Sequence, residues 1–310
     1  MNTILITTST FDLKSSEHLS ALESKGFRIV FNPYGRKLTE AEVTALIEEY
    51  QPLAMIAGIE PLNRPALNAA KFLKVISRCG IGLDSVDLHA AGDLGIAVTN
   101  TPDAPTIPVA ELTITVILCL LRQNYISHES IRRGTWQRPM GTLLHGKTAG
   151  VVGCGRIGTY VARLLSNFGC RVLGYDITSH KSDWFENTDL SVVLKDSDIV
   201  TLHLTYSEDN HHFMSRERIA LMKEGAFLIN TARGSLVDEE ALYDALTSGR
   251  LAGAALDCFE EEPYHGPLKD LENVLLSAHI GSYAKEARVL MERQAAENLL
   301  RELTKIGVIV

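Results

Sequence analysis

Short apolar runs alternate with segments of helical spacing along most of this chain. In the first hundred residues the apolar runs predict strands at 4–7, 27–31, 54–57, 75–77 and 97–99. Helical spacing between them predicts helices, for example at 16–25 and 40–50, with Gly26 as a stop signal. Strands that alternate with helices indicate a parallel, doubly wound sheet.

A second series of the same kind begins after residues 100–105, which read NTPDAP. The segment 109–122 is so apolar that we expect a helix buried on several sides, either in a domain junction or in a subunit interface. Helices are also expected at 238–246 and, as one long element, at 285–303. Further strands are predicted at 149–152, 171–175, 199–204, 226–230, 253–256 and 274–277. A chain of 310 residues has room for about two such α/β domains.

The stretch 148–176 has a distinctive order of elements. An apolar run leads into Gly153-Cys154-Gly155-Arg156-Ile157-Gly158, a helical segment follows, and a second apolar run ends on Asp176. A Rossmann unit holds a dinucleotide with this order of strand, glycine-rich turn, helix, strand and acid. Gly153 permits the tight turn, Gly155 lets the backbone approach the pyrophosphate, and Gly158 lets the helix sit close to the sheet. The pyrophosphate would lie at the positive end of the helix.

Asp176 indicates which dinucleotide is bound. A carboxylate at this position accepts hydrogen bonds from the ribose hydroxyls, and its charge would repel a 2′-phosphate. The sequence therefore predicts NAD rather than NADP. The first half of the chain has no such motif.

Composition narrows the class of protein. The net charge of −8 argues against general nucleic-acid binding. The five cysteines are scattered without CxxC spacing, which favours reduced core residues in a reducing compartment. The N-terminus resembles a first strand rather than a signal peptide, and the longest apolar run is too short to span a bilayer. We therefore expect a cytoplasmic protein that binds neither nucleic acid nor membranes.

Three polar groups directly follow predicted strands of the second half. Arg233 follows AFLINTA, His279 follows VLLSA, and Asp257 follows AGAAL with Glu262 five residues on. Ligands of an open parallel sheet bind outside the carboxyl ends of its strands, where these groups should converge. Their chemistry suits the reduction of a carbonyl. A histidine exchanges a proton with the alkoxide, a carboxylate holds the imidazole, and an arginine grips a substrate carboxylate with two parallel hydrogen bonds.

Two of these residues, His279 and Glu262, also have a purely structural interpretation. His279 alone would be typical of a hydrogen-bonded structural histidine, and Glu262 could belong to a solvated acidic turn, 260–262. The basic connector 132–138 is equally consistent with a solvated loop and with a segment that contacts an anion. The joint pattern after the strands is what favours an active site.

The chain resembles the D-2-hydroxyacid dehydrogenase family along nearly its whole length, and most closely the phosphoglycerate dehydrogenase branch. The motifs that carry the resemblance are RCGIGLD at 78–84, NTP at 100–102, VAE at 109–111, GCGRIG at 153–158, NTARG at 230–234, DCF through EP at 257–263, and HIG at 279–281. The resemblance implies a catalytic set of Arg233, Glu262 and His279, in agreement with the argument from the residues.

The same resemblance assigns ligand-binding roles. Backbone amides of the loop at 80–83 are expected to hold the substrate carboxylate, and Asp257 is expected to face the nicotinamide carboxamide. The expected substrate residues are Arg78, Gly80, Ile81, Gly82, Arg138 and Arg233, where Arg138 would reach across a dimer. The expected NAD residues are Gly153, Gly155, Arg156, Ile157, Gly158, Asp176, Leu204, Thr205, Thr231, Ala232, Arg233, Asp257, His279 and Gly281, and no metal ligand is expected.

The resemblance also implies an architecture. It consists of a discontinuous, flavodoxin-like substrate domain at 1–100 plus 285–310, a Rossmann NAD-binding domain at 101–284, and a homodimer formed through the NAD-binding domains. Three positions depart from the usual family pattern: Ser85 follows Asp84, Thr205 replaces a common proline, and Ala278 replaces the proline before the histidine. The regulatory extension of many phosphoglycerate dehydrogenases is not in the sequence, so feedback by serine through such a domain is not expected.

The expected substrate is a small anionic D-2-hydroxy acid and its 2-keto acid, with 3-phosphoglycerate as the first candidate because of Arg78 and Arg138. The alternatives are reduction of glyoxylate or hydroxypyruvate and oxidation of a phosphonate-type hydroxy acid. A different class is also open, because transcriptional corepressors of this family sense NAD with the same fold and the same three residues.

Overall fold

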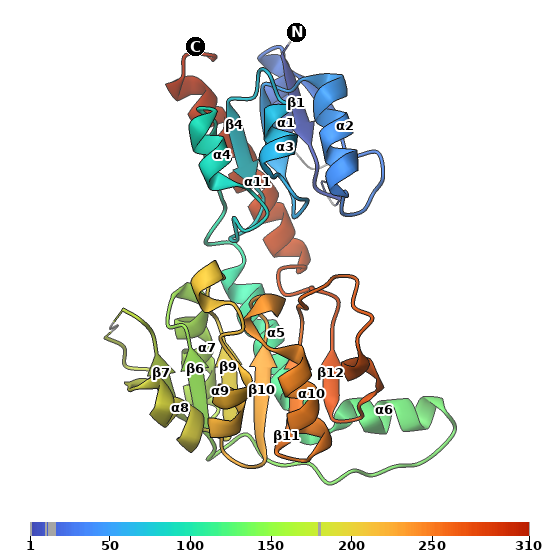
Figure 1. Cartoon of the computed structure of the whole chain (residues 1–310), viewed down its shortest axis with the longest axis vertical. Coiled ribbons are helices and arrows are strands. Elements are labelled where there is room, and N and C mark those ends of the chain that lie inside the picture. The colour runs from blue at the N-terminus through green and yellow to red at the C-terminus, as the bar shows by residue number, and fades with distance from the viewer. Residues whose placement is uncertain (1, 10, 12–16, 179–180, 310) are drawn as a thin grey trace. The chain divides into compact units, whose positions relative to one another are not determined.

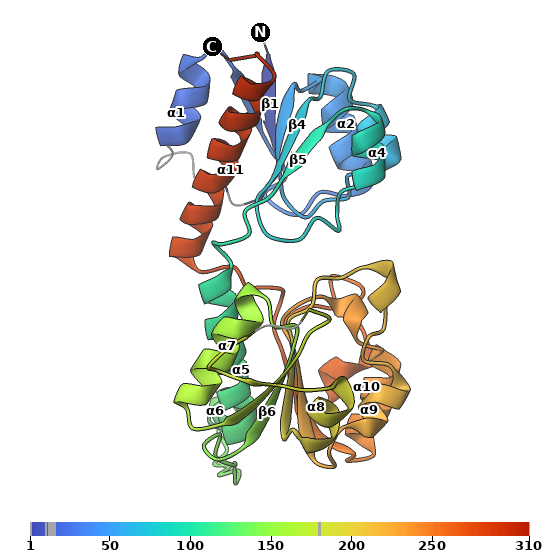
Figure 2. The same ribbon diagram turned by 90° about the vertical axis from the view of Figure 1, so that its left-hand side faces the viewer.

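The computed structural model describes residues 2–9, 11, 17–178 and 181–309. The chain divides into two compact units, Met1–Pro105 with Ala284–Val310, and Thr106–Tyr283. In each unit, helices cover both faces of a parallel β-sheet (Figures 1 and 2). The predicted fold class, two doubly wound parallel-sheet domains, is confirmed.

The described residues of the first unit form a five-stranded sheet in the order β2-β1-β3-β4-β5, which is the flavodoxin-like order. Its strands are β1 (Thr3–Ile6), β2 (Arg28–Phe31), β3 (Ala54–Ala57), β4 (Val75–Arg78) and β5 (Ala97–Thr99). Its helices are α1 (Glu17–Ser24), α2 (Glu40–Tyr50), α3 (Arg64–Asn68), α4 (Leu88–Asp93) and α11 (Lys285–Lys305).

Alternate residues of the strands feed two separate cores in this unit. Ile4 and Ile6 pack on the side of α1 and α11, whereas Leu5 packs on the side of α2, α3 and α4. Figure 2 shows α11 beside α1 on one face of the sheet. The C-terminal helix thus completes a unit whose strands all come from the first hundred residues.

The described part of the second unit forms a seven-stranded sheet in the order β12-β11-β10-β9-β6-β7-β8. The strands β8-β7-β6-β9-β10-β11 follow the classical Rossmann order 3-2-1-4-5-6. The order along the sequence reverses between β6 and β9. The strands are β6 (Thr148–Val152), β7 (Arg171–Tyr175), β8 (Glu186–Asn187), β9 (Ile199–Leu202), β10 (Ala226–Asn230), β11 (Leu251–Leu256) and β12 (Val274–Leu276).

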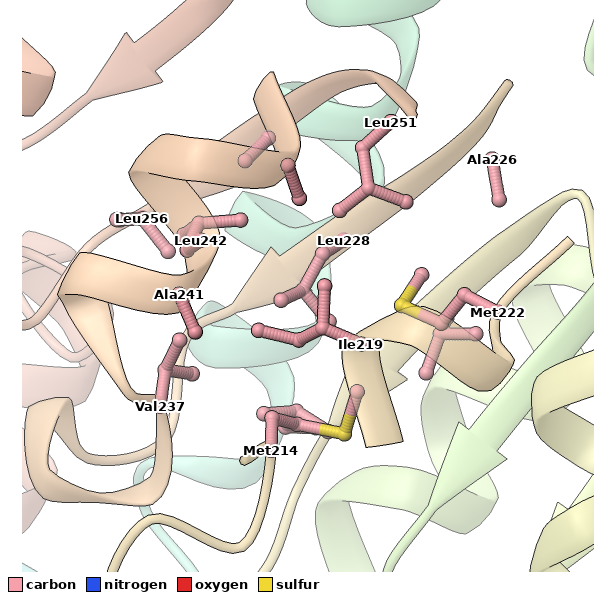
Figure 3. Packing of buried hydrophobic residues seen from close by; sticks show 14 of the residues in the cluster. Met214, Ile219, Met222, Ala226, Leu228, Val237, Ala241, Leu242, Leu251 and Leu256 are labelled. Atoms are coloured by element: carbon pink, nitrogen blue, oxygen red, sulfur yellow. The ribbon is translucent and has the colours of Figure 1, made fainter. Parts of the chain in front are cut away.

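Helices cover this sheet on both faces. On one face, α5 and α7 pack over a core that includes Ile117, Val151 and Leu165. On the other, α8, α9 and α10 enclose a second core, and Figure 3 shows Ile219 of α9 and Leu242 of α10 near Leu228 of β10. The helical elements are α5 (Thr106–Arg122), α6 (Asn124–Arg132), α7 (Arg156–Asn167), α8 (Leu190–Asp196), α9 (Arg216–Leu221), α10 (Glu239–Thr247), η2 (Glu208–Asn210), η3 (Gly234–Leu236) and η4 (Pro267–Asp270).

The apolar helix α5 is longer than the predicted helix at 109–122. Its surroundings also differ from the domain junction or subunit interface that was expected. It begins at Thr106, because a proline such as Pro108 is tolerated in the first turn of a helix. It packs against α7 and against β10, β11 and β12 of its own unit. The core of the second unit therefore accounts for much of its apolar character. Residues 132–138 were expected to form a connector. The helix before them, α6, was not predicted from the sequence.

Among the described residues, no single helix is long and apolar enough to cross a membrane. The helices α5 and α6 meet that criterion only when taken together, and they form a pair bent by 71°.

Candidate active site

The glycine-rich turn lies at the point where the strand order of the second sheet reverses. Gly153 has a φ of 93°, and a side chain there would press on the backbone of His203 and Leu204 at the end of β9. A side chain at Gly158 would collide with the carbonyl group of Gly153. These two glycines are therefore required by the protein's own packing.

Gly155 is different, because a side chain there would meet no protein atom within 4 Å. It is the N-cap of α7, where backbone N–H groups lie free of helical hydrogen bonds. The open space beside a helix N-terminus fits a dinucleotide pyrophosphate, which needs close approach and donors. Arg156 and Ile157, the other predicted pyrophosphate contacts, occupy the first turn of α7.

Asp176 lies directly after β7, and its carboxylate is held at the glycine-rich turn. Oδ2 accepts a hydrogen bond of 2.7 Å from the Cys154 amide, and Oδ1 accepts one of 2.9 Å from the Thr178 amide. A carboxylate oxygen can accept more than one hydrogen bond, so these two bonds do not by themselves exclude a ribose hydroxyl. Burial, together with the charge of Asp176, raises the pKa of the Cys154 thiol to about 12, so the thiol stays neutral. The neutral thiol therefore adds no charge of its own beside the Asp176 carboxylate.

Glu262 and His279 form the centre of the site. The Glu262 carboxylate lies 2.9 and 3.1 Å from Nδ1 of His279, and both side chains are partly exposed. His279 has a φ of 53°, in the left-handed region that a non-glycine residue seldom adopts outside functional sites. Because Nδ1 is bound to the carboxylate, Nε2 is the nitrogen that can exchange a proton with a substrate.

Asp257 fixes the loop that carries His279. Its buried carboxylate accepts hydrogen bonds from Ser277 Oγ at 2.6 Å, from the Ile280 amide at 2.9 Å and from the Gly281 amide at 2.7 Å. The Ser277 side chain before the histidine and the backbone after it are thus tied to Asp257, which directly follows β11. The sequence did not reveal this role, because the contacts join segments about 20 residues apart and Ser277 carries no motif of its own. The expected contact of Asp257 with the carboxamide remains a prediction.

Arg233 follows β10 on a loop shaped by Asn230. The Asn230 amide group donates to the carbonyl of Arg233 at 2.8 Å, and its side-chain oxygen accepts from the amide of Ala232 at 3.1 Å. Gly234 lies so close to the backbone of Phe259 that a side chain would collide with it. The loop of Arg233 is thereby held against the loop that leads to Glu262.

The buried Cys258 thiol lies near charged groups of these loops. Burial raises the pKa of the Cys258 thiol well above its ordinary value; Arg233 opposes this shift, whereas Asp257 and Glu262 reinforce it. The three groups therefore all lie within electrostatic range of one buried atom. The structure brings together the charged residues that the sequence placed after β10, β11 and β12.

The other predicted NAD contacts border the same strand ends. Leu204 and Thr205 follow β9, and Thr231 follows β10 with its hydroxyl 2.9 Å from that of Thr113 on α5. Their contacts with a bound cofactor remain predictions.

The predicted substrate residues are divided between the two units. In the first unit the Arg78 guanidinium is buried and donates to the carbonyl of Cys79. The Gly80 amide donates to Thr101 Oγ1 at 2.8 Å, so the amides of residues 81–83 remain the expected donors of this loop to a substrate carboxylate. In the second unit, Arg138 and Arg122 line a pocket of about 520 Å³.

Glu60 is a buried acidic residue of the first unit that its local sequence does not indicate. Glu60 lies after β3 and is hydrogen-bonded to Thr7 Oγ1 and to the Gly58 amide. Burial raises its pKa, and the charge of Arg78 opposes this shift. An acidic residue in a short polar segment carries no signal of burial, so the sequence alone did not indicate it.

Comparisons with known proteins place this site in context. A family model described as "D-isomer specific 2-hydroxyacid dehydrogenase, NAD binding domain" matches residues 114–281, which confirms NAD as the predicted cofactor. A D-3-phosphoglycerate dehydrogenase of Methanocaldococcus jannaschii is 40% identical over 86% of this chain and 52% of its own length. The chain thus spans about half the length of that relative. A glyoxylate reductase of Thermofilum pendens is 42% identical over 79% of this chain and 76% of its own length.

A solved structure agrees with these matches. The D-lactate dehydrogenase of Aquifex aeolicus, complexed with NAD and lactic acid, is 28% identical. It superposes with a TM-score of 0.84 over 98% of this chain and 96% of its own.

Proposed function

Because this chain belongs to the D-isomer-specific 2-hydroxyacid dehydrogenase family, we propose that it interconverts a D-2-hydroxy acid and its 2-keto acid with NAD. The first candidate pair is 3-phosphoglycerate and 3-phosphohydroxypyruvate. The family and the relatives named above are dehydrogenases and reductases of such acids, in agreement with the predicted enzyme class. The observation that carries the proposal is the Glu262–His279 pair, held by Asp257 on the same sheet edge as the glycine-rich turn.

The residues of this chain would divide the work of the reaction. Bound NAD supplies the hydride acceptor or donor. Gly155 and the first turn of α7 bind the pyrophosphate, and Asp176 binds the ribose. His279 Nε2 takes the hydroxyl proton during oxidation and returns it to the carbonyl oxygen during reduction, while Glu262 stabilises the charged imidazole. Arg233 grips the substrate carboxylate and polarises the adjacent carbonyl.

The substrate is tested by initial rates with NADH against hydroxypyruvate phosphate, hydroxypyruvate, glyoxylate and 2-oxoglutarate. A large kcat/KM advantage for the phosphorylated acid is the expected result. A preference for glyoxylate or hydroxypyruvate would instead support the second candidate function, reduction of these acids. The similarity to the glyoxylate reductase favours that function. NADH binding without turnover of any acid would instead support an NAD-sensing protein.

Arg138 is the residue proposed to recognise the phosphate. We expect Arg138→Ala to lower kcat/KM for hydroxypyruvate phosphate far more than for glyoxylate. Arg133→Ala is the matched control, because Arg133 is also exposed and its guanidinium is paired with Glu129. Equal losses for both substrates in Arg138→Ala would remove the phosphate assignment.

The proposed assembly is a homodimer formed through the second unit, in the cytoplasm. Large apolar side chains are exposed on α6 and the segment after it, which extend from the body of that unit (Figure 1). They are Ile131, Trp136, Met140 and Leu143, of which Met140 is 90% exposed. Several large apolar side chains exposed along one segment are what an interface would remove from water. All five cysteines are free in the described structure, which suits a reducing compartment.

The dimer is tested by light scattering of the purified chain. Wild-type protein is expected at twice the chain mass, and Trp136→Glu with Met140→Glu is expected to be monomeric. Phe72→Glu, a similar change at an exposed aromatic residue of the first unit, should leave the mass unchanged. A monomeric wild-type protein would refute the assembly.

A further inference from the structure

A cluster of two histidines and one glutamate lies outside the proposed catalytic set. His211 and His212 follow η2 on the connection between β9 and α9, and Glu260 lies on the loop after β11. One ligand atom from each residue lies within 4.8 Å of the others. We propose that these three side chains bind a divalent transition-metal ion of the zinc type, which would join the two loops.

The backbone at His212 is what brings the two imidazoles together. Neighbouring residues in an extended segment point to opposite sides, but His212 has a φ of 49°. The two rings are consequently stacked, with centroids 4.0 Å apart. This left-handed residue is further held by its amide, which donates to the carbonyl of Ser235 at 2.8 Å. Two imidazoles on one side of a loop form a chelating pair.

The distances from the Glu260 carboxylate to the two imidazole nitrogens are close to those of a coordination sphere. Glu260 Oε1 lies 3.6 Å from His211 Nε2 and 3.2 Å from His212 Nε2. Ligands at about 2.0–2.1 Å from a tetrahedral zinc ion are separated by about 3.3–3.4 Å, so these spacings lie close to those required. The nearly parallel rings must splay to direct both lone pairs at one ion. The side chains are partly exposed, and the second torsion of a histidine rotates at low cost.

Groups around the cluster favour a cation and orient its ligands. The hydroxyl of Tyr206 lies 3.5 Å from Nδ1 of His211 and can accept a hydrogen bond from it; in that tautomer Nε2 is the nitrogen that coordinates. Glu239 accepts a hydrogen bond of 2.9 Å from the Glu260 amide, so a second carboxylate borders the site. Imidazole nitrogens with a carboxylate oxygen are a ligand set for zinc, nickel or copper rather than for calcium or magnesium.

Such an ion would have a defined structural consequence. Glu260 lies two residues before Glu262, on the loop that presents the catalytic carboxylate. A metal bond from His211 and His212 would tie that loop to the connection after β9. An ion that binds the folded chain in preference to the unfolded chain raises its melting temperature.

The test is zinc binding to untagged protein that has been dialysed against a chelator, measured by isothermal titration calorimetry without NAD. We expect one ion per chain, and a rise in Tm when zinc is added. His211→Ala, His212→Asn and Glu260→Gln should each weaken binding at least tenfold and abolish the Tm shift. Asparagine is chosen at position 212 because it tolerates the left-handed conformation.

His265→Ala is the matched control, since His265 lies on the same loop, is exposed and is outside the cluster. It should bind zinc as the wild type does. Cobalt provides a second readout, because a tetrahedral cobalt complex has visible absorption that the cluster variants should lack. The proposal is overturned if no saturable binding occurs, or if the three variants bind zinc as tightly as the wild type. Neither outcome depends on dehydrogenase activity.

Discussion

The two units share one architecture but treat polar groups at their strand ends in opposite ways. In the first unit, Glu60 is 1% exposed and its hydrogen bonds are to protein groups of the same unit. In the second unit, the side chains of Glu262 and His279 are 24% and 34% exposed. They are hydrogen-bonded to each other, and the Glu262 carboxylate also accepts a hydrogen bond from the Phe259 amide. In both units these residues lie at the strand ends of a parallel sheet. The Glu262–His279 pair differs from Glu60 in being partly exposed.

The largest expected effect comes from His279→Ala. General acid–base catalysis is worth about 100- to 10,000-fold, so kcat for keto-acid reduction should fall by that factor. The Kd for NADH, measured by fluorescence titration, should change little, because the histidine acts on the substrate. Glu60→Gln provides the contrast in the first unit and should retain most of the rate. If both variants lost activity equally, the distinction between the reactive Glu262–His279 pair and the structural acid Glu60 would fail.

Asp176→Ala should have the next largest effect, on cofactor choice. Hydrogen bonds to a charged group are worth about 1.5–3 kcal/mol, which corresponds to about 10- to 100-fold in NADH affinity. Removal of the charge should at the same time improve the binding of NADPH relative to NADH. The ratio of kcat/KM values for the two cofactors measures this. An unchanged ratio would contradict the ribose role of Asp176.

Substitutions at Gly158 and Gly155 measure the effects of packing and of cofactor contact separately. Gly158→Ala should lower Tm, because overpacking against the Gly153 carbonyl costs about 1–3 kcal/mol. Gly155→Ala should leave Tm nearly unchanged, since its Cβ meets open space, but should weaken NADH binding. Thermal melts and NADH titrations of both variants check this. A normal NADH affinity in Gly155→Ala would show that the open space is not used by the cofactor.

The smallest effects concern the dependence of stability on pH, for which the two units should differ in sign. In the second unit, burial lowers the pKa of His203 from 6.5 to about 3. Between these values the unfolded chain binds more protons than the folded chain, so stability is lost as the pH falls from 6.5 towards 3. In the first unit, burial raises the pKa of Glu60 above 4.5, so stability is lost as the pH rises from 4.5 through its folded pKa.

Melting temperatures across this range test both signs. A change of 1 kcal/mol shifts Tm by about 2–4 °C in a domain of 150–250 residues. His203→Gln should reduce the loss at acid pH, and Glu60→Gln should reduce the loss at higher pH. If the variants had the same dependence of Tm on pH as the wild type, His203 and Glu60 would be excluded as the source of that dependence.

The sequence predicted the central strands well because they are buried on both faces and appear as apolar runs. It missed β8, Glu186–Asn187, because both residues are polar and exposed at the sheet edge. It missed α3 and α4, which have 5 and 6 residues, because a helix of that length shows too little periodicity. Their N-caps, Asn63 and Asp87, are the signals that could have revealed them.

The site was predicted to the extent that its chemistry lies next to apolar runs. Gly153 and Asp176 follow strands directly, whereas Arg233 and His279 come three residues after β10 and β12. The order of the strands explains why these four residues share one edge of the sheet. The Asp257 clamp and the cluster at Glu260 depend on contacts between distant segments, which no local pattern specifies. The substrate pocket remains a prediction because its expected residues belong to both units.

The central claim is that the second unit directs hydride transfer between NAD and carbon 2 of a keto acid. The most direct measurement uses NADH deuterated at both C4 positions, with hydroxypyruvate phosphate and glyoxylate as substrates and mass spectrometry of the products. The account predicts one deuterium at carbon 2 of each product, and the D isomer of phosphoglycerate from the first substrate. NADH binding with no deuterium in any product, or formation of the L isomer, would contradict it.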